Sequence, residues 1–148
     1  GHITVRDDET EACGCGRKGC LEQYASATGL VRLAKRYFEK NTKNSILTGK
    51  EITAKEVFDA AKAGDAAALE ITEEFGAYLG QALVNLAATV DPAVFVIGGG
   101  VSKAGDILLE TVRKYFYDHA FYGNQKTKIT LATLGNDAGI YGAAKQVL

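Results

Sequence analysis

The sequence lacks the features that mark several classes of protein. Its 148 residues contain no signal peptide, no apolar run long enough to cross a membrane and no polybasic tract. Its 17 basic residues are balanced by 18 acidic ones, so there is no basic face to bind a nucleic-acid backbone. It also has no internal repeat and no low-complexity run, which argues against a solenoid. We therefore expect a folded domain without a membrane or nucleic-acid partner.

The chain also has only one proline and no methionine, whereas it has 17 glycines. A hydrophobic content of 47% is enough for a real core, and together with the many glycines it predicts a tightly turned α/β protein. There is no initiating Met, and apolar and polar residues alternate from His2 to Arg6 as they do in a strand. We therefore expect the sequence to be a fragment that opens inside a strand.

All three cysteines, Cys13, Cys15 and Cys20, fall within eight residues, and His2 precedes them. Three thiols and an imidazole are the donor set of a closed tetrahedral zinc site, and the intervening glycines let a short loop turn. The alternatives are free cysteines or a disulfide. An odd number leaves one thiol over, and two cysteines only two residues apart strain a bridge. We predict one zinc ion in a reduced, cytoplasmic setting.

A helix is predicted from Gly29 to about Lys40, capped by Ser26 or Thr28. Its basic residues are expected to face water, and the acidic turn over residues 6–9 is expected to be a solvated loop. The basic residues in question are Arg32, Lys35, Arg36 and Lys40.

Two more helices are predicted, one capped by Thr53 and the next by Asp65. The second extends to about Val90 and carries a stripe of small residues. Such a stripe predicts close packing against a neighbouring element and also permits a subunit interface.

The apolar run Ala93–Ile97 predicts a strand that is buried on both faces of a central sheet. Gly98, Gly99 and Gly100 follow, and residues 101–106 then lead into a predicted helix that extends to about Phe121. A strand is predicted over residues 128–134. A strand, a glycine turn and a helix start form a place where backbone amides can face nucleotide phosphates. The glycines match neither the dinucleotide fingerprint nor a Walker loop, so a turn without a ligand is the alternative.

Four motifs, in this order and spacing, resemble the ROK family (repressor, open reading frame, kinase). They are Gly1-His2, Cys13-x-Cys15-Gly16-x-x-Gly19-Cys20-x-Glu22, Ile97-Gly98-Gly99-Gly100-Val101-Ser102 and Leu134-Gly135-x-x-Ala138-Gly139-x-x-Gly142-Ala143-Ala144. They extend over nearly the whole chain. The Ser26-Ala27-Thr28-Gly29 stretch is similar to the bacterial ATP-dependent glucokinase branch.

The resemblance implies an actin-like (ribonuclease-H-like) α/β fold of two lobes, in which a hexose hydroxyl attacks the γ-phosphate of Mg-ATP. The chain would form part of the carboxyl-terminal lobe, and the amino-terminal lobe would be absent. Residues 2–22 would be the zinc loop, residues 26–90 a helical segment and residues 93–148 the strand–helix units on the nucleotide side.

Carried over residue by residue, the resemblance implies that His2, Cys13, Cys15 and Cys20 bind a structural zinc ion. It also implies that His2 and Glu22 contact the sugar. Zinc with four protein ligands has no open position, so it would shape the sugar pocket without acting as a Lewis acid. The alternative for Glu22 is a surface carboxylate at a helix start.

The resemblance further implies that Gly98, Gly99 and Gly100 bind the adenosine of ATP. Ser102 and Lys103 are additional candidates for phosphate contact.

The parts of the family that perform phosphoryl transfer have no match in this sequence. These are an amino-terminal phosphate loop, an Asn-Asp pair whose aspartate is the general base, a second glycine-rich motif and a glutamate three residues before His2. No catalytic residue is therefore assigned, since the general base is expected upstream.

We expect the chain to be an inactive portion of a homodimeric, glucokinase-like enzyme that makes glucose 6-phosphate from glucose and ATP. The alternatives are the sugar-sensing domain of a ROK transcriptional regulator, a kinase for another hexose such as an N-acetylhexosamine, and a stand-alone zinc module.

Overall fold

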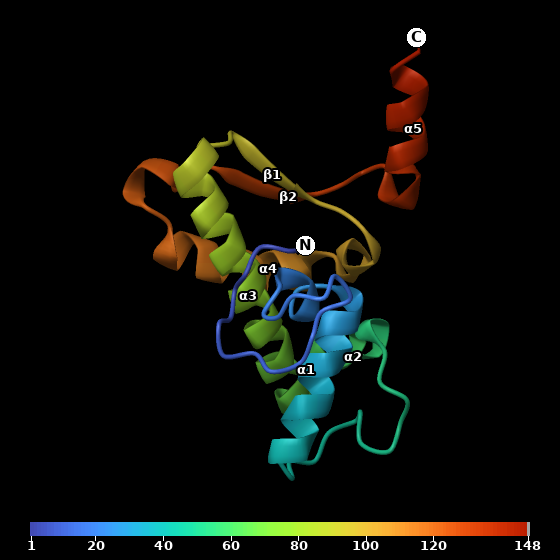
Figure 1. Ribbon diagram of the computed structural model, residues 1–148. Helices are drawn as coiled ribbons and strands as arrows, with labels where there is room; N and C mark the ends of the chain where they lie inside the picture. The colour runs from blue at the N-terminus through green and yellow to red at the C-terminus, as the bar shows by residue number, and fades with distance from the viewer. Residues whose placement is uncertain (148) are drawn as a thin grey trace.

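The computed structural model describes residues 1–147 and combines helices with a small parallel sheet (Figure 1). The helices are α1 (Ala27–Lys40), α2 (Ala54–Lys62), α3 (Ala66–Val90), α4 (Asp106–His119) and α5 (Ala138–Lys145), and the strands are β1 (Val94–Ile97) and β2 (Lys128–Leu131). Short 3-10 turns are η1 (Leu21–Gln23), η2 (Gly100–Ala104), η3 (Tyr122–Asn124) and η4 (Gly135–Asp137).

The predicted caps of the first three helices are confirmed. Ser26 Oγ accepts a hydrogen bond from the Gly29 amide, and Thr53 forms a capping box with Glu56. Asp65 accepts from the Ala68 amide and also from Ser45 and the Ile46 amide, so it holds the preceding loop as well. These ends are set by side chains within a few residues, which is why the sequence alone predicts them.

Helix α3 is the centre of the core, and α1, α2 and α4 each pack against it (Figure 1). Its buried Ile71 and Phe75 lie among side chains from the other helices. The stripe of small residues lies against α4, because Gly76 faces Thr111 and Gly80 faces Tyr115. The expected close packing is therefore within the chain, and contact with a second copy stays a prediction.

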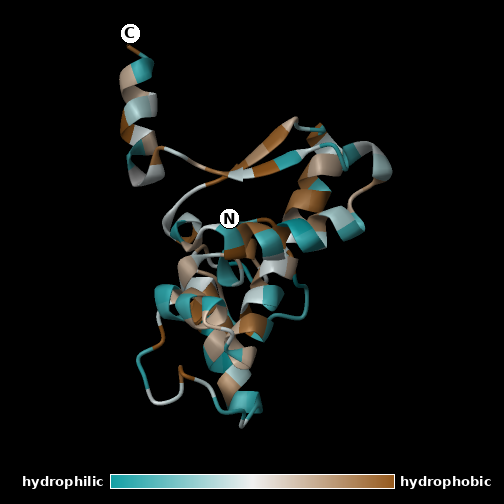
Figure 2. Ribbon diagram, turned by 180° about the vertical axis from the view of Figure 1, so that it is seen from behind, coloured by the Kyte–Doolittle hydropathy of each residue, from teal (hydrophilic) through white to brown (hydrophobic). Residues whose placement is uncertain are grey.

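Strands β1 and β2 pair in parallel, with Val94 opposite Lys128, and α4 lies between them in sequence. This strand–helix–strand unit confirms the expected mixture of helix and sheet. Phe95 contacts Phe116 of α4 edge to face, and Ile97 is buried. The prediction that β1 is buried on both faces is wrong, since Val94 is 44% and Val96 60% exposed. No second layer covers that side within the described residues, and Figure 2 shows the apolar colour along β1.

Two predicted strands also differ from the structure in their extent. Residues 2–6 form no strand; Thr4 makes a single bridge to Cys20, because the partner segment turns into η1 at once. The helix predicted after residues 101–106 is confirmed, since α4 begins at Asp106, directly after Gly105 (φ 74°), and ends at His119. The strand expected to reach residue 134 ends at Leu131, near the point where β1 itself ends.

Helix α5 stands apart from the other elements at the end of the segment that follows β2 (Figure 1). None of its described side chains is buried, and Ile140 and Tyr141 are 70% and 59% exposed. Together with Val94 and Val96, these side chains form apolar surface that the described residues leave uncovered. None of the described helices is both long and apolar enough to cross a membrane.

We predict that Gly76→Ala lowers the free energy of unfolding by about 1–3 kcal/mol, measured by urea denaturation. A methyl group there would lie 2.7 Å from Thr111 Cβ and 2.9 Å from its carbonyl carbon, so α3 and α4 would have to separate. Gly142→Ala is the control, because nothing lies within 4 Å of its added Cβ and alanine favours the helix. Equal losses from both variants would refute the packing role of Gly76.

Candidate functional site

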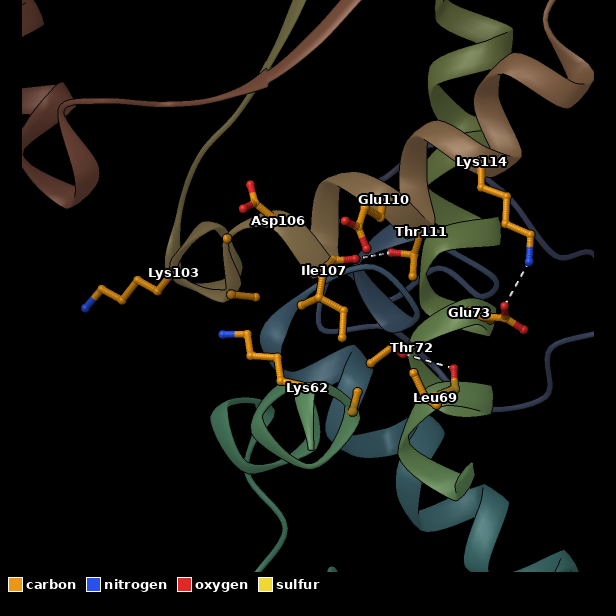
Figure 3. Close-up of a pocket in the computed structure, with 13 residues that line it drawn as sticks. Lys62, Leu69, Thr72, Glu73, Lys103, Asp106, Ile107, Glu110, Thr111 and Lys114 are labelled. Carbon is orange, nitrogen blue, oxygen red and sulfur yellow. Dashed lines mark hydrogen bonds and ion pairs between the residues drawn. The ribbon is translucent and has the colours of Figure 1, made fainter. Parts of the chain in front are cut away.

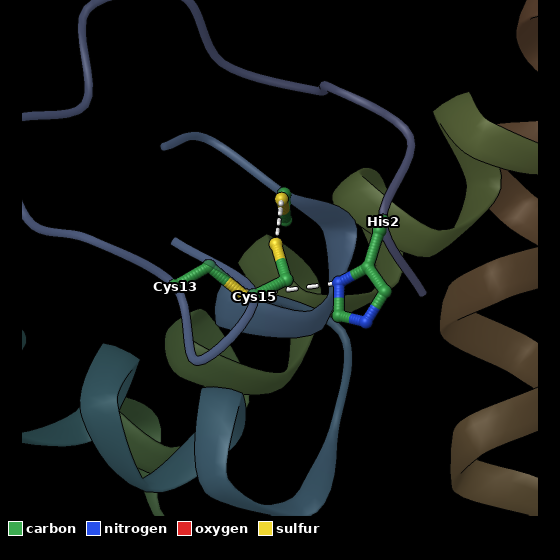
Figure 4. Close-up of side chains that lie close together, drawn as sticks. His2, Cys13 and Cys15 are labelled. Carbon is green, nitrogen blue, oxygen red and sulfur yellow. Dashed lines mark hydrogen bonds between the residues drawn. The ribbon is translucent and has the colours of Figure 1, made fainter. Parts of the chain in front are cut away.

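His2, Cys13, Cys15 and Cys20 lie together, and Figure 4 labels the first three of these side chains. Their four candidate donor atoms are all within 4.8 Å of one another. The Cys15 and Cys20 sulfurs are 3.6 Å apart, and Cys13 Sγ is 3.8 Å from His2 Nδ1. A tetrahedron with metal–sulfur bonds of about 2.3 Å has sulfur–sulfur edges of about 3.8 Å. The donor set therefore fits a single four-coordinate metal ion.

Backbone contacts give the cysteine loop this shape. The Cys13 amide donates to the Arg17 carbonyl at 2.6 Å and closes a tight turn. The Arg17 guanidinium then donates to the His2 carbonyl at 2.6 Å, which ties the loop to the opening segment. Gly19 has φ 69°, and a Cβ on it would lie 1.7 Å from the Arg6 carbonyl oxygen. Only glycine allows the two segments to approach this closely.

The thiols have different electrostatic surroundings. Burial raises the pKa of the Cys20 thiol to about 11, and the neighbouring Cys15 and Cys13 sulfurs add to the effect. The backbone N–H of Arg17 lowers the pKa of the exposed Cys15 thiol. A bound dication favours thiolates, so it offsets the cost of charge on buried Cys20.

His2 and Glu22 lie on neighbouring backbone segments. The Glu22 amide donates to the Gly1 carbonyl at 2.7 Å, and the Glu22 carboxylate extends past Gly1. Both side chains are exposed. Figure 4 shows His2 with Nδ1 toward the sulfurs and its other ring nitrogen turned away. That nitrogen and the Glu22 carboxylate thus remain available to a ligand.

Gly98, Gly99 and Gly100 are exposed at the carboxyl end of β1. Gly99 has φ 80°, and its carbonyl accepts hydrogen bonds from both the amide and the hydroxyl of Ser102. A cavity of about 390 Å³ lies beside Gly100, and Phe58 and Lys62 of α2 form part of its wall. Lys103 also lines it. The glycine turn is therefore open to a ligand on its α2 side, whereas the Ser102 hydroxyl is occupied within the turn.

A second cavity, of about 870 Å³, lies between α2, α3 and the start of α4 (Figure 3). Its charged lining residues are Lys62, Lys103, Lys114, Glu73, Asp106 and Glu110. Three cations thus face three carboxylates, and Lys114 is paired with Glu73 at 2.9 Å. This balance gives the cavity no net charge with which to attract phosphates.

Three residues of the acidic turn and the basic face of α1 differ from their prediction, whereas the others are exposed as expected, namely Arg6, Asp7, Asp8, Lys35 and Lys40. Glu9 is buried, with only 7% of the residue exposed, and Arg32 and Arg36 contact its carboxylate. The prediction that these groups are solvated is therefore wrong for all three. The spacing of Arg32 and Arg36 indicated one part of this arrangement, because arginines four residues apart lie on the same face of a helix. The carboxylate that they bind comes from a loop, which no helical periodicity reveals.

Comparisons with known proteins identify the family of the chain. The ROK family model matches residues 1–148. A glucokinase from Halalkalibacterium halodurans is 43% identical over 147 residues, which cover 96% of this chain and 44% of that enzyme. The crystal structure of a ROK family glucokinase from Streptomyces griseus, in complex with glucose and AMPPNP, has a TM-score of 0.86 and 37% identity, and the match covers 99% of this chain and 49% of that one.

A ROK family transcriptional regulator, a homolog of the E. coli MLC protein, matches with a TM-score of 0.72 and 28% identity over 88% of this chain and 33% of that one. The chain thus spans less than half the length of each of these proteins. Because the family model matches residues 1–148, the chain belongs to the ROK family.

Proposed function

We propose that the chain is part of a glucokinase-like ROK enzyme that transfers the γ-phosphate of ATP to glucose and forms glucose 6-phosphate. The observation that carries the proposal is the cluster of His2 with three cysteines, with Glu22 on the adjoining segment. It occurs in a chain that matches a glucose-bound glucokinase over 99% of its residues. The general base is proposed to belong to another part of the full-length protein, because this chain spans less than half the length of the glucokinases that it matches.

The chain is proposed to be part of the carboxyl-terminal lobe of an actin-like fold. Within it, residues 2–22 form the metal loop, residues 26–90 the helical segment and residues 93–148 the nucleotide-side units. The exposed apolar face of β1 and the uncovered apolar side chains of α5 support this proposal, because a complete lobe would cover them.

The metal is proposed to be zinc, since three thiolates and an imidazole in a closed tetrahedron are a typical structural zinc site. If Nδ1 bound the metal, the neutral His2 ring would carry its proton on Nε2 and would donate a hydrogen bond from that N–H to a sugar oxygen. The Glu22 carboxylate accepts hydrogen bonds from sugar hydroxyls. These two residues bind and orient the hexose, and all four metal positions are filled by the protein.

Gly98, Gly99 and Gly100 are proposed to contact the adenosine of Mg-ATP. The positive φ of Gly99 and the cavity beside Gly100 support this role, because the backbone there is open and has no side chain to exclude a ligand. Lys103 lines the same cavity and is a candidate for phosphate contact.

We predict one zinc per chain by elemental analysis after purification without chelators. His2→Ala should lower zinc affinity at least tenfold, because it removes one of four ligands. His119→Ala is the matched control, since it removes the chain's other histidine, which stacks on Tyr115 of the same helix. Equal zinc content and affinity in both variants would remove His2 from the ligand set.

We predict that Glu22→Gln in the full-length protein lowers kcat/KM for glucose about 10- to 100-fold, with zinc retained. The reason is that a hydrogen bond to a charged acceptor contributes about 1.5–3 kcal/mol. Steady-state kinetics with glucose and with an N-acetylhexosamine would measure the loss and identify the preferred sugar. Glu51→Gln, an exposed carboxylate in a loop, is the control. Unchanged glucose kinetics in the Glu22 variant would refute its role.

A second candidate function is the sugar-sensing domain of a ROK regulator, which the similarity to the regulator structure supports. The same His2 and Glu22 would then bind a sugar without phosphoryl transfer. Sugar binding by the full-length protein in calorimetry, together with no ATP consumption, would favour this candidate.

A further inference from the structure

Glu9 is the only carboxylate that is buried among the described residues, and just 2% of its side chain is exposed. It lies outside the proposed metal and sugar site, four residues before Cys13. Burial of an ionised carboxylate is costly unless charged partners and hydrogen bonds surround it. Glu9 must therefore have such partners in the folded chain.

The Glu9 carboxylate is surrounded by donors. Arg36 approaches as a fork, with Nη1 3.1 Å from Oε2 and Nη2 3.1 Å from Oε1, and Arg32 Nη2 lies 2.7 Å from Oε2. The Tyr24 hydroxyl also donates to Oε2, and Oε1 accepts the amides of Thr10 and Glu11, each at 2.9 Å. Burial opposes the ionised form, but these donors outweigh it and hold the pKa of Glu9 well below its usual range.

These partners connect the two ends of the cysteine loop. Glu9 belongs to the segment that leads into the loop, and Tyr24 follows two residues after Glu22. Gln23 adds a parallel link, since its amide nitrogen donates to the Glu11 carbonyl at 3.0 Å and its oxygen accepts from the Cys20 amide at 3.1 Å. Both ends of the loop are thereby joined to each other and, through Arg32 and Arg36, to α1.

We propose that Glu9, with Arg32, Arg36 and Tyr24, is a positioning residue that sets the geometry of the metal loop and, through it, of His2 and Glu22. The sugar part of this inference rests on the proposed function, whereas the metal part does not. A buried ion pair seldom adds net stability over an apolar pair, but its fixed geometry holds one arrangement of the chain. Metal ligands need that control, because they must lie within about 0.2 Å of ideal distances.

The test compares Glu9→Gln with Glu11→Gln in the full-length, zinc-loaded protein. Both variants remove one negative charge near the same two arginines, but the Glu11 side chain is 63% exposed. We expect Glu9→Gln to release zinc to a chromogenic chelator about tenfold faster and to raise the KM for glucose about tenfold, as for changes around metal ligands. The KM for ATP should stay within about twofold, and Glu11→Gln should change none of these values more than about twofold.

Arg36→Lys is the second variant, because it keeps the positive charge near Glu9 and Glu11 but removes the fork to both Glu9 oxygens. It should change zinc release and the KM for glucose in the same direction as Glu9→Gln. If Glu9→Gln does not fold, Arg36→Lys alone tests whether the Glu9 contacts position the metal loop. Identical behaviour of the Glu9 and Glu11 variants, or an equal rise in the KM values for glucose and ATP, would overturn the proposal. If the wild-type protein phosphorylates no hexose, the proposed function fails, and zinc release alone still judges the role of Glu9.

Discussion

Helix α3 passes through the core, and the other helices of the core reach their positions by packing against it. The close contact with α4 depends on Gly76 and Gly80, which have no side chain to hold the helices apart. Because α4 also covers the inner face of β1, this contact fixes where the strand pair and the glycine turn lie relative to the helical segment. On the other side, α1 packs on α3 and presents Arg32 and Arg36 to the loop that carries the cysteines. A single helix thus connects the two parts of the molecule that are proposed to bind ligands.

The two parts differ in how their backbone is shaped. The glycine turn follows a regular strand, and its open conformation depends on the positive φ of Gly99. The cysteine loop contains almost no regular structure, and it depends instead on specific contacts at Arg17, Gly19 and Glu9. Such a loop can hold donors in an arrangement that neither a helix nor a strand offers. Its shape is correspondingly sensitive to the few side chains that make those contacts.

Sequence reasoning succeeded where a structure is decided within a few residues. The caps at Ser26, Thr53 and Asp65 depend on local hydrogen bonds. The three cysteines lie within eight residues of one another in the sequence, so a short loop is enough to bring them together in the fold. It failed where distant residues decide the outcome. The exposure of Val96 depends on what covers the sheet, and the burial of Glu9 depends on arginines 23 and 27 residues away. Neither hydropathy nor periodicity carries that information.

The orientation of His2 has a consequence for the kind of ligand atom that the proposed sugar site accepts. If a metal holds Nδ1, the imidazole is fixed in one tautomer and acts only as a donor, while the Glu22 carboxylate acts only as an acceptor. A hydroxyl satisfies both, because it accepts with its oxygen and donates with its hydrogen. An ether oxygen or a fluorine can accept a hydrogen bond from His2 but has no hydrogen to donate to Glu22. The metal would therefore do more than hold the loop: by setting the position of one proton, it would make the site selective for alcohols.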